Sequence, residues 1–151
     1  MLAVYALIAI VITVADQLIK FWIQGNVALG DTFYTIPHIA DFVFVKNTGA
    51  AFSLLSGKVS VLSVVSAVFC ICIIVYFIVK RPKNPLLCTS LALVFSGALG
   101  NAIDRIAHGY VVDFISVSFM NFPVFNIADI AITVGAVLLV VYEVFFDKKN
   151  E

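Results

Sequence analysis

The chain has few charged residues, and few of the residues that build disulfides or metal sites. Of its 151 residues only 12% are charged, nine Lys and Arg balance nine Asp and Glu, and there are two His and three Cys. A net charge of zero argues against nucleic acid as a partner, because polyanions are bound by an excess of positive charge. Three cysteines do not fit a disulfide framework. Two histidines without an H-E-x-x-H pattern do not indicate a zinc site either.

Hydrophobic side chains take the place of the missing charges. They make up 63% of the residues, and the mean hydropathy is +1.14. The charged share is about half that of an ordinary soluble domain, so too much apolar surface remains for a soluble protein to bury. Lipid must cover part of that surface. The sequence therefore predicts an integral membrane protein, and its length fits a single domain over residues 1–151.

Four apolar stretches are long enough to cross a bilayer, which takes about 20 helical residues. They cover residues 2–23, 59–79, 86–106 and 123–145, and Pro123 suits the start of the last helix. Residues 27–57 are too polar to span, and their aromatic and β-branched residues predict short strands at 31–38 and 41–45. We therefore expect an all-α membrane protein with four transmembrane helices and a small extracytoplasmic β-segment between helices 1 and 2.

Basic residues indicate how the helices are oriented. Lys80, Arg81 and Lys83 lie between the second and third spans, and Lys148 and Lys149 follow the fourth. Four spans put both clusters on one side, which the positive-inside rule makes cytoplasmic. Both termini are then expected inside, and most polar residues of the spans gather at the outer ends of the helices.

Two aspartates stand in strongly apolar surroundings, Asp113 in Gly109–Phe114 and Asp129 in Phe125–Ile130. A carboxylate at membrane depth costs about 3 kcal/mol and usually marks an ion path, a proton relay or a catalytic group. If the two meet, repulsion and burial raise one pKa, and the pair holds one shared proton. Such a dyad suits amide hydrolysis, in which one carboxylate activates water and its protonated partner polarises the carbonyl.

Other polar residues are spaced to share helix faces with these aspartates. Asn101, Asp104 and Arg105 are related by i, i+3 and i+4, which puts them on one face of a helix. This face is either part of a site or a helix end whose long charged side chain reaches the membrane interface. Asp16 and Lys20, at i and i+4, predict an intrahelical ion pair that braces a site.

Asn126 lies three residues before Asp129, so it either caps the fourth helix or faces the bundle interior. The expected partners of Asp129 are Arg105, Lys20 and Asp113.

The residues alone leave several functions open. A Ser–Lys dyad of Lys20 with Ser53 or Ser56 is compatible with the sequence, as is proton- or ion-coupled transport. A transporter more naturally has its carboxylates near the membrane midplane. Here they gather at one edge, which favours chemistry at the outer leaflet.

Five motifs occur in order along the chain and carry a family resemblance. They are Asp16-Gln17 with Lys20, Asn47-Thr48-Gly49-Ala50-Ala51-Phe52, Gly100-Asn101-Ala102-Ile103-Asp104-Arg105, Gly109-Tyr110-Val111-Val112-Asp113-Phe114 and Phe125-Asn126-Ile127-Ala128-Asp129. Over nearly its whole length the chain resembles the lipoprotein signal peptidases (signal peptidase II).

The resemblance implies a bacterial membrane aspartic endopeptidase that cuts prolipoproteins before their diacylglyceryl-modified cysteine. It implies Asp113 and Asp129 as the catalytic dyad, no metal or organic cofactor, and inhibition by globomycin-type peptides. The remaining expected substrate-binding or site-supporting residues are Asp16, Lys20, Asn47, Gly49, Asn101, Asp104, Arg105 and Asn126.

The expected setting is the cytoplasmic (inner) membrane, with a monomer among membrane lipids and its active site at the outer leaflet, where the β-segment forms a cradle for substrate. A small proton- or ion-coupled transporter is the alternative, and a non-catalytic lipoprotein-binding protein the third possibility.

Overall fold

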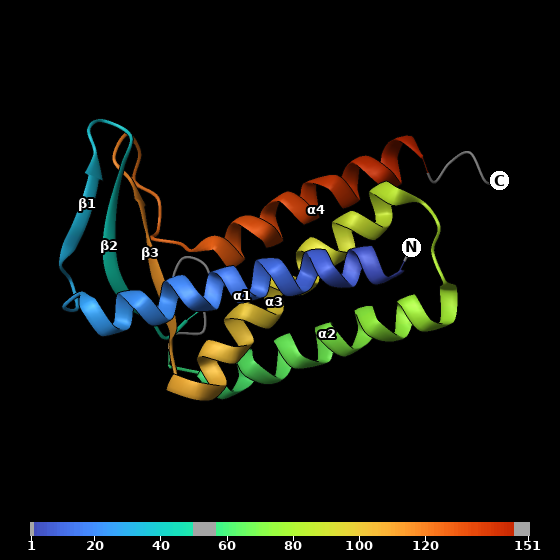
Figure 1. The fold of residues 1–151 in the computed structure, drawn as a ribbon, viewed down its shortest axis with the longest axis horizontal. Coiled ribbons are helices and arrows are strands. Elements are labelled where there is room, and N and C mark those ends of the chain that lie inside the picture. The colour runs from blue at the N-terminus through green and yellow to red at the C-terminus, as the bar shows by residue number, and fades with distance from the viewer. Residues whose placement is uncertain (1, 50–56, 147–151) are drawn as a thin grey trace.

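The computed structural model describes residues 2–49 and 57–146, which form four helices and a three-stranded sheet (Figure 1). The elements in chain order are α1 (Leu2–Asn26), β1 (Thr32–Ile36), β2 (Ala40–Asn47), α2 (Val59–Lys80), α3 (Pro85–His108), β3 (Val111–Val117) and α4 (Ile127–Phe145). The helices run side by side with the sheet at one end. The start of α1, the end of α4 and the α2–α3 link lie at the other end. The expected four helices and small sheet are confirmed.

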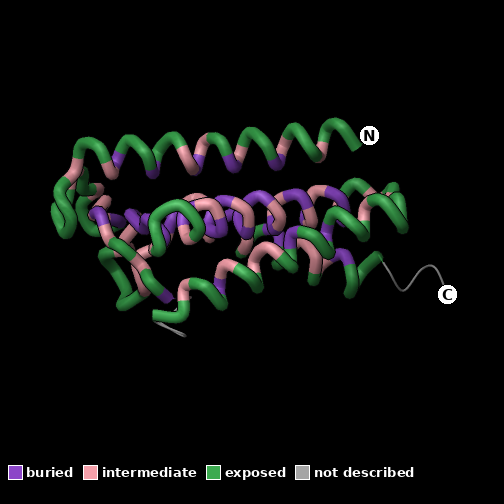
Figure 2. The backbone as a smooth tube through the Cα atoms, turned by 90° about the horizontal axis from the view of Figure 1, so that it is seen from below, coloured by how far each residue is buried: buried purple, intermediate pink, exposed green. Residues whose placement is uncertain are grey.

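Helix α3 forms the centre of the bundle. In its most apolar stretch 61% of the residues are buried, against 17% in α1, 17% in α2 and 22% in α4, and Figure 2 shows purple concentrated along α3. All four helices are long and apolar enough to cross a membrane. The outward faces of α1, α2 and α4 are rich in exposed Val, Ile and Leu, as expected of surfaces covered by lipid.

The sheet is antiparallel in the order β1-β2-β3. The predicted strands 31–38 and 41–45 correspond to β1 and β2, but β3 was not predicted; it lies between the third and fourth predicted spans. Val45 pairs with Asp113 and Asn47 with Val111, so β2 and β3 carry polar residues of the motifs side by side. Val112 and Phe114 of β3 are buried with Ile23 of α1, which anchors the sheet to the bundle.

The start of the fourth helix differs from the prediction. Helix α4 begins at Ile127 with Asn126 as its N-cap, rather than at Pro123. The reason is that Phe125 exchanges backbone hydrogen bonds of 2.8 and 3.0 Å with Ile115 of β3, which keeps the preceding chain extended.

All three cysteines are free. Cys70 and Cys88 are buried, but Cys72 is exposed on α2. Several residues used in the predictions lie outside the described residues, namely Ala50, Ala51, Phe52, Ser53, Ser56, Lys148 and Lys149.

Candidate active site

Asn126 joins the two aspartates at the sheet end of the bundle. Its side-chain Nδ2 donates to Asp113 Oδ1 at 2.7 Å, and its backbone N–H donates to Asp129 Oδ2 at 3.2 Å. The sequence left Asn126 either as a helix cap or as an inward-facing residue, and it is both. It forms a capping box with Asp129 while its amide reaches Asp113, so strand β3 and helix α4 bring the carboxyl groups to one place.

Asp113 is the more deeply buried of the two aspartates, with 2% of its surface exposed. Asn47 Nδ2 donates to Asp113 Oδ2 at 2.8 Å, and the Asn47 oxygen accepts the Gly49 backbone N–H at 2.9 Å. Burial, and secondarily the charge of Asp129, raise the pKa of Asp113 to about 7 against the opposing hydrogen bonds from Asn47 and Asn126. Asp113 is therefore able to hold a proton near neutral pH.

Asp129 lies in the first turn of α4 and is only partly buried. Its Oδ1 accepts a 2.7 Å hydrogen bond from Asn101 Nδ2. The donors among the described residues are thus Asn101 and the Asn126 backbone, not the predicted Arg105 or Lys20. A helix N-terminus favours a negative charge, because its unpaired N–H groups point toward it.

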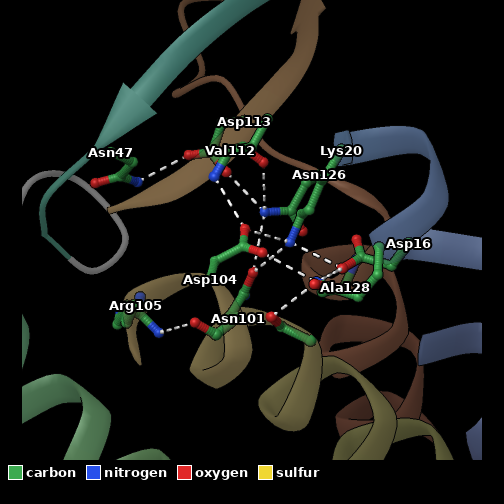
Figure 3. A network of polar contacts seen from close by, with 12 residues as sticks. Asp16, Lys20, Asn47, Asn101, Asp104, Arg105, Val112, Asp113, Asn126 and Ala128 are labelled. Carbon is green, nitrogen blue, oxygen red and sulfur yellow. Dashed lines mark hydrogen bonds and ion pairs between the residues drawn. The ribbon is translucent and has the colours of Figure 1, made fainter. Parts of the chain in front are cut away.

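Lys20 is the centre of a buried ionic cluster that connects α1 to α3 (Figure 3). Its Nζ lies 2.8 Å from Asp16 Oδ2 and 3.0 Å from Asp104 Oδ2, with all three side chains 1% exposed. It also donates to Asn101 Oδ1 at 3.1 Å. The predicted Asp16–Lys20 pair exists, but the interhelical partners Asp104 and Asn101 could not be derived from spacing along one helix.

The two acids of this cluster hold neighbouring elements in place. Asp104 Oδ2 accepts the backbone N–H of Val112 at 3.0 Å, which fixes β3 beside α3. Asp16 Oδ1 accepts the backbone N–H of Ala128 at 3.1 Å, which fixes the start of α4. Asp113 and Asp129 therefore each lie next to a residue whose backbone N–H is bound by the Lys20 cluster.

Gln17 belongs to the cluster, although sequence reasoning gave it no role. Its Nε2 donates to Asp104 Oδ1 at 2.9 Å, to the Gly100 carbonyl at 3.1 Å and to Asp16 Oδ2 at 3.2 Å. The available signal was its position between two charged residues in an apolar span.

Arg105 is half-buried and bridges α3 to the chain that follows β2. Its Nη2 donates to the Gly49 carbonyl at 3.2 Å, and its Nη1 lies 3.5 Å from the Asn101 carbonyl. It forms no salt bridge with a described carboxylate, although its charge interacts with Asp129, Asp113 and Asp104, in decreasing order. The guanidinium therefore faces the site rather than acting only as a snorkelling helix end.

A groove of about 810 Å³ begins at these polar groups and continues between apolar helix faces. Within residues 2–49 and 57–146, no three His, Cys, Asp or Glu side chains are grouped so as to hold a metal ion. The polar end of the groove is formed by Asn47, Asn101, Arg105, Asp113 and Asp129, and its apolar walls include Val65 and Phe69 of α2, Val94 of α3, and Ile130, Val134 and Leu139 of α4.

The family model described as signal peptidase (SPase) II matches residues 8–145. The chain belongs to the signal peptidase II family. It is thus a peptidase and a multi-pass bacterial membrane protein, and no finding favours the transporter alternative.

Relatives and solved structures agree with this membership. The lipoprotein signal peptidase of Lactobacillus johnsonii is 38% identical over 148 residues, covering 98% of this chain and 96% of the relative. The lipoprotein signal peptidase of Lactobacillus gasseri is 40% identical, covering 97% of this chain and 95% of the relative. The lipoprotein signal peptidase of Staphylococcus aureus is 38% identical, covering 89% of this chain and 84% of the relative. A bacterial membrane enzyme solved in meso at 2.3 Å resolution superposes with a TM-score of 0.90 at 35% identity, covering 99% of this chain and 92% of that one.

Proposed function

We propose that this signal peptidase II is an aspartic endopeptidase, with Asp113 and Asp129 as its catalytic dyad. It hydrolyses the peptide bond before the diacylglyceryl-modified cysteine of prolipoproteins. The observation that carries the proposal is that Asn126 holds both carboxyl groups at the polar end of an otherwise apolar groove. A substrate with an apolar segment next to its scissile bond fits this arrangement, because the segment lies between the helices while the peptide bond meets the carboxyl groups.

The reaction needs only water and the two carboxyl groups. One carboxylate accepts a proton from water as the water oxygen attacks the scissile carbonyl carbon, and the protonated partner gives its proton to the carbonyl oxygen. The resulting gem-diol collapses when the first carboxyl returns its proton to the leaving nitrogen and the second recovers a proton from a diol hydroxyl. The C–N bond breaks, and the dyad regains its single proton.

The neighbouring residues orient the dyad and the substrate. Asn47, Asn101 and Asn126 hold the carboxyl oxygens, while Arg105 faces the substrate and fixes the Gly49 carbonyl. Globomycin-type peptides occupy the same groove as the substrate. Confining the lipid anchor of the substrate to the bilayer plane lowers the entropic cost of aligning the scissile bond. We expect the protein to act as a monomer among membrane lipids, with the whole chain forming a single peptidase domain.

The proposal is tested with purified protein in detergent and a fluorescent lipobox peptide that carries a diacylglyceryl-modified cysteine. Asp113→Asn and Asp129→Asn should each lower turnover roughly 100- to 10,000-fold, the range of general acid–base catalysis. Asp41→Asn is the matched control, because Asp41 is a carboxylate of the sheet that accepts hydrogen bonds from the Thr35 and Ser118 side chains, away from Asp113 and Asp129. Retained cleavage in either dyad variant removes that residue from the mechanism, and equal cleavage of an unlipidated peptide removes the lipid requirement.

A further inference from the structure

We infer that the two carboxyl groups have fixed and different roles, with Asp113 carrying the proton of the dyad as its acid and Asp129 acting as its base. The different surroundings of the two carboxyl groups set these roles, and the hydrogen bonds that begin at Lys20 hold the groups in those surroundings. The inference rests on the proposed function and adds what that proposal leaves open, namely which aspartate does which part of the reaction.

Lys20 fixes the orientation of the Asn101 amide. An ammonium group has only donors, so the Asn101 atom 3.1 Å from Lys20 Nζ must be the amide oxygen. The other end is then NH₂, which can only donate, and it lies 2.7 Å from Asp129 Oδ1. Lys20 therefore makes Asn101 present a donor to Asp129. A flipped amide would place NH₂ against the ammonium.

The orientation of the Asn126 amide is fixed as well. Its oxygen accepts the backbone N–H of Asp129 at 2.9 Å, so its Nδ2 is the end that donates to Asp113 Oδ1 and, at 3.1 Å, to Asn101 Oδ1. Asn101 Oδ1 thus accepts from both Lys20 and Asn126, and neither amide can turn without losing several hydrogen bonds. The donors around the dyad are fixed by the surrounding structure.

The two carboxyl groups lie in different environments. Asp129 lies in the first turn of α4, is only partly buried, and accepts the backbone N–H of the N-cap residue Asn126. Asp113 lies in a strand, 2% exposed, and its donors are two neutral amides. A negative charge is better stabilised at the helix terminus than in the buried strand, so Asp113 keeps the proton.

The remaining charged groups around the site support this division. On the described elements packed against the dyad these are Asp16 and Lys20 of α1, Asp104 and Arg105 of α3, and Asp41 and Lys46 of β2, where Lys46 pairs with Val112 of β3. The Lys20 ammonium is shared between Asp16 and Asp104; it orients Asn101 through a hydrogen bond, and its charge acts on Asp113 to lower the pKa of that carboxyl. Lys20 is thus a positioning residue, because it touches neither aspartate of the dyad.

Infrared spectroscopy of the purified protein tests the assignment without any substrate. A protonated carboxyl group gives a C=O stretch apart from that of a carboxylate. At about pH 6, below the pKa of Asp113, the parent protein should show this band. Asp113→Asn should abolish it, whereas Asp129→Asn should retain it, with a lower titration midpoint because the neighbouring charge is gone. A band that persists in Asp113→Asn and disappears in Asp129→Asn would reverse the roles. No band in the parent would overturn the inference too.

The role of Lys20 is tested by Lys20→Gln and Lys20→Arg, with Thr13→Val as matched control. Thr13 is a buried polar residue of α1 that bonds the Ser96 carbonyl of α3, away from the dyad. Lys20→Gln should raise the titration midpoint of the Asp113 band, because a nearby positive charge is lost, and Lys20→Arg should restore it. An unchanged midpoint in folded Lys20→Gln would make Lys20 merely structural.

If Lys20→Gln does not fold, Asn101→Ala is the second variant, because it keeps the ion pairs of Lys20. Asn101→Ala should still broaden or shift the band, and an unchanged band would contradict the link from Lys20 through Asn101 to the dyad. Because these infrared measurements need no cleavage, the assignment of roles can fail while the peptidase proposal holds. The peptidase proposal can likewise fail in the cleavage assay while the assignment of the proton holds.

Discussion

At the scale of single residues, Lys20 shows how this protein keeps charge inside an apolar bundle. A buried ion without partners costs several kcal/mol, which close pairing and additional hydrogen bonds can offset. Lys20 has two carboxylates within 3.0 Å and an amide oxygen at 3.1 Å, and its two acids accept backbone N–H groups from β3 and α4. The cluster therefore compensates its own burial while it fixes the segments that carry Asp113 and Asp129.

If Asp113 and Asp129 form the proposed dyad, the rate of cleavage has a predictable dependence on pH. Its pKa is raised to about 7, chiefly by burial, so the side chain is protonated below that value and loses its proton above it. Because the dyad needs this proton for the carbonyl oxygen, kcat/KM for the lipidated peptide should fall tenfold per pH unit above about 7. Initial rates measured between about pH 5 and pH 9 check this. A constant rate up to the alkaline end, with the protein still folded, would contradict it.

At the scale of elements, the close contact between α3 and α4 positions Asn101 against Asp129. A Cβ atom added at Gly97 would overlap the carbonyl oxygen of Ala128 and lie 2.6 Å from Ile132 Cγ1, so the helices can pack this closely only because Gly97 has no side chain. Gly97→Ala should force them apart and destabilise the protein by about 1–3 kcal/mol. It should also lower turnover, because the Asn101–Asp129 hydrogen bond is stretched.

Thermal unfolding in detergent and peptide cleavage measure the two effects of Gly97→Ala. Gly25→Ala in α1 is the control, since a Cβ there meets nothing within 4 Å. Unchanged stability and turnover in Gly97→Ala would show that the helices can separate without disturbing the dyad.

The sequence predicts these elements only in part, for physical reasons. Long apolar runs reveal membrane helices because lipid imposes length and hydropathy on each segment alone, and the four spans were located to within a few residues. Strand β3 was not predicted, because Val111–Val117 is buried around its aspartate instead of alternating between a polar and an apolar face. The helix start at Ile127 was missed because the pairing of Phe125 with β3 is a tertiary contact.

The candidate site was predictable to the same extent. The helical spacing of Asn101, Asp104 and Arg105 placed them near one another, and the apolar surroundings of Asp113 and Asp129 marked both as exceptional. Which atoms meet could not be read from spacing, since Lys20 reaches Asp104 and Asn101 between helices more than 80 positions apart in sequence. Gln17, although part of the first motif, was given no role for the same reason, because two of its three acceptors lie on α3.

At the level of the whole molecule, the polar site and the basic α2–α3 link lie at opposite ends of the bundle. The sheet and the dyad are at one end of the bundle, and the α2–α3 link with Lys80, Arg81 and Lys83 is at the other (Figure 1). Basic residues in short links stay on the cytoplasmic side. The protein should therefore insert with the sheet outside, where the carboxyl groups would meet the proposed substrate after it has crossed the membrane.

This orientation predicts opposite labelling of two single cysteines. In a background where Cys70, Cys72 and Cys88 are replaced by Ala, Tyr34→Cys lies on exposed β1 and Lys83→Cys in the exposed α2–α3 link. A maleimide that cannot cross membranes should label Tyr34→Cys in intact cells whose outer barrier is permeable, and Lys83→Cys only after the cytoplasmic membrane is opened. The reverse pattern would place the dyad on the cytoplasmic face. Because an exported lipoprotein precursor presents its modified cysteine at the outer leaflet, the dyad would then be on the wrong side of the membrane to reach it.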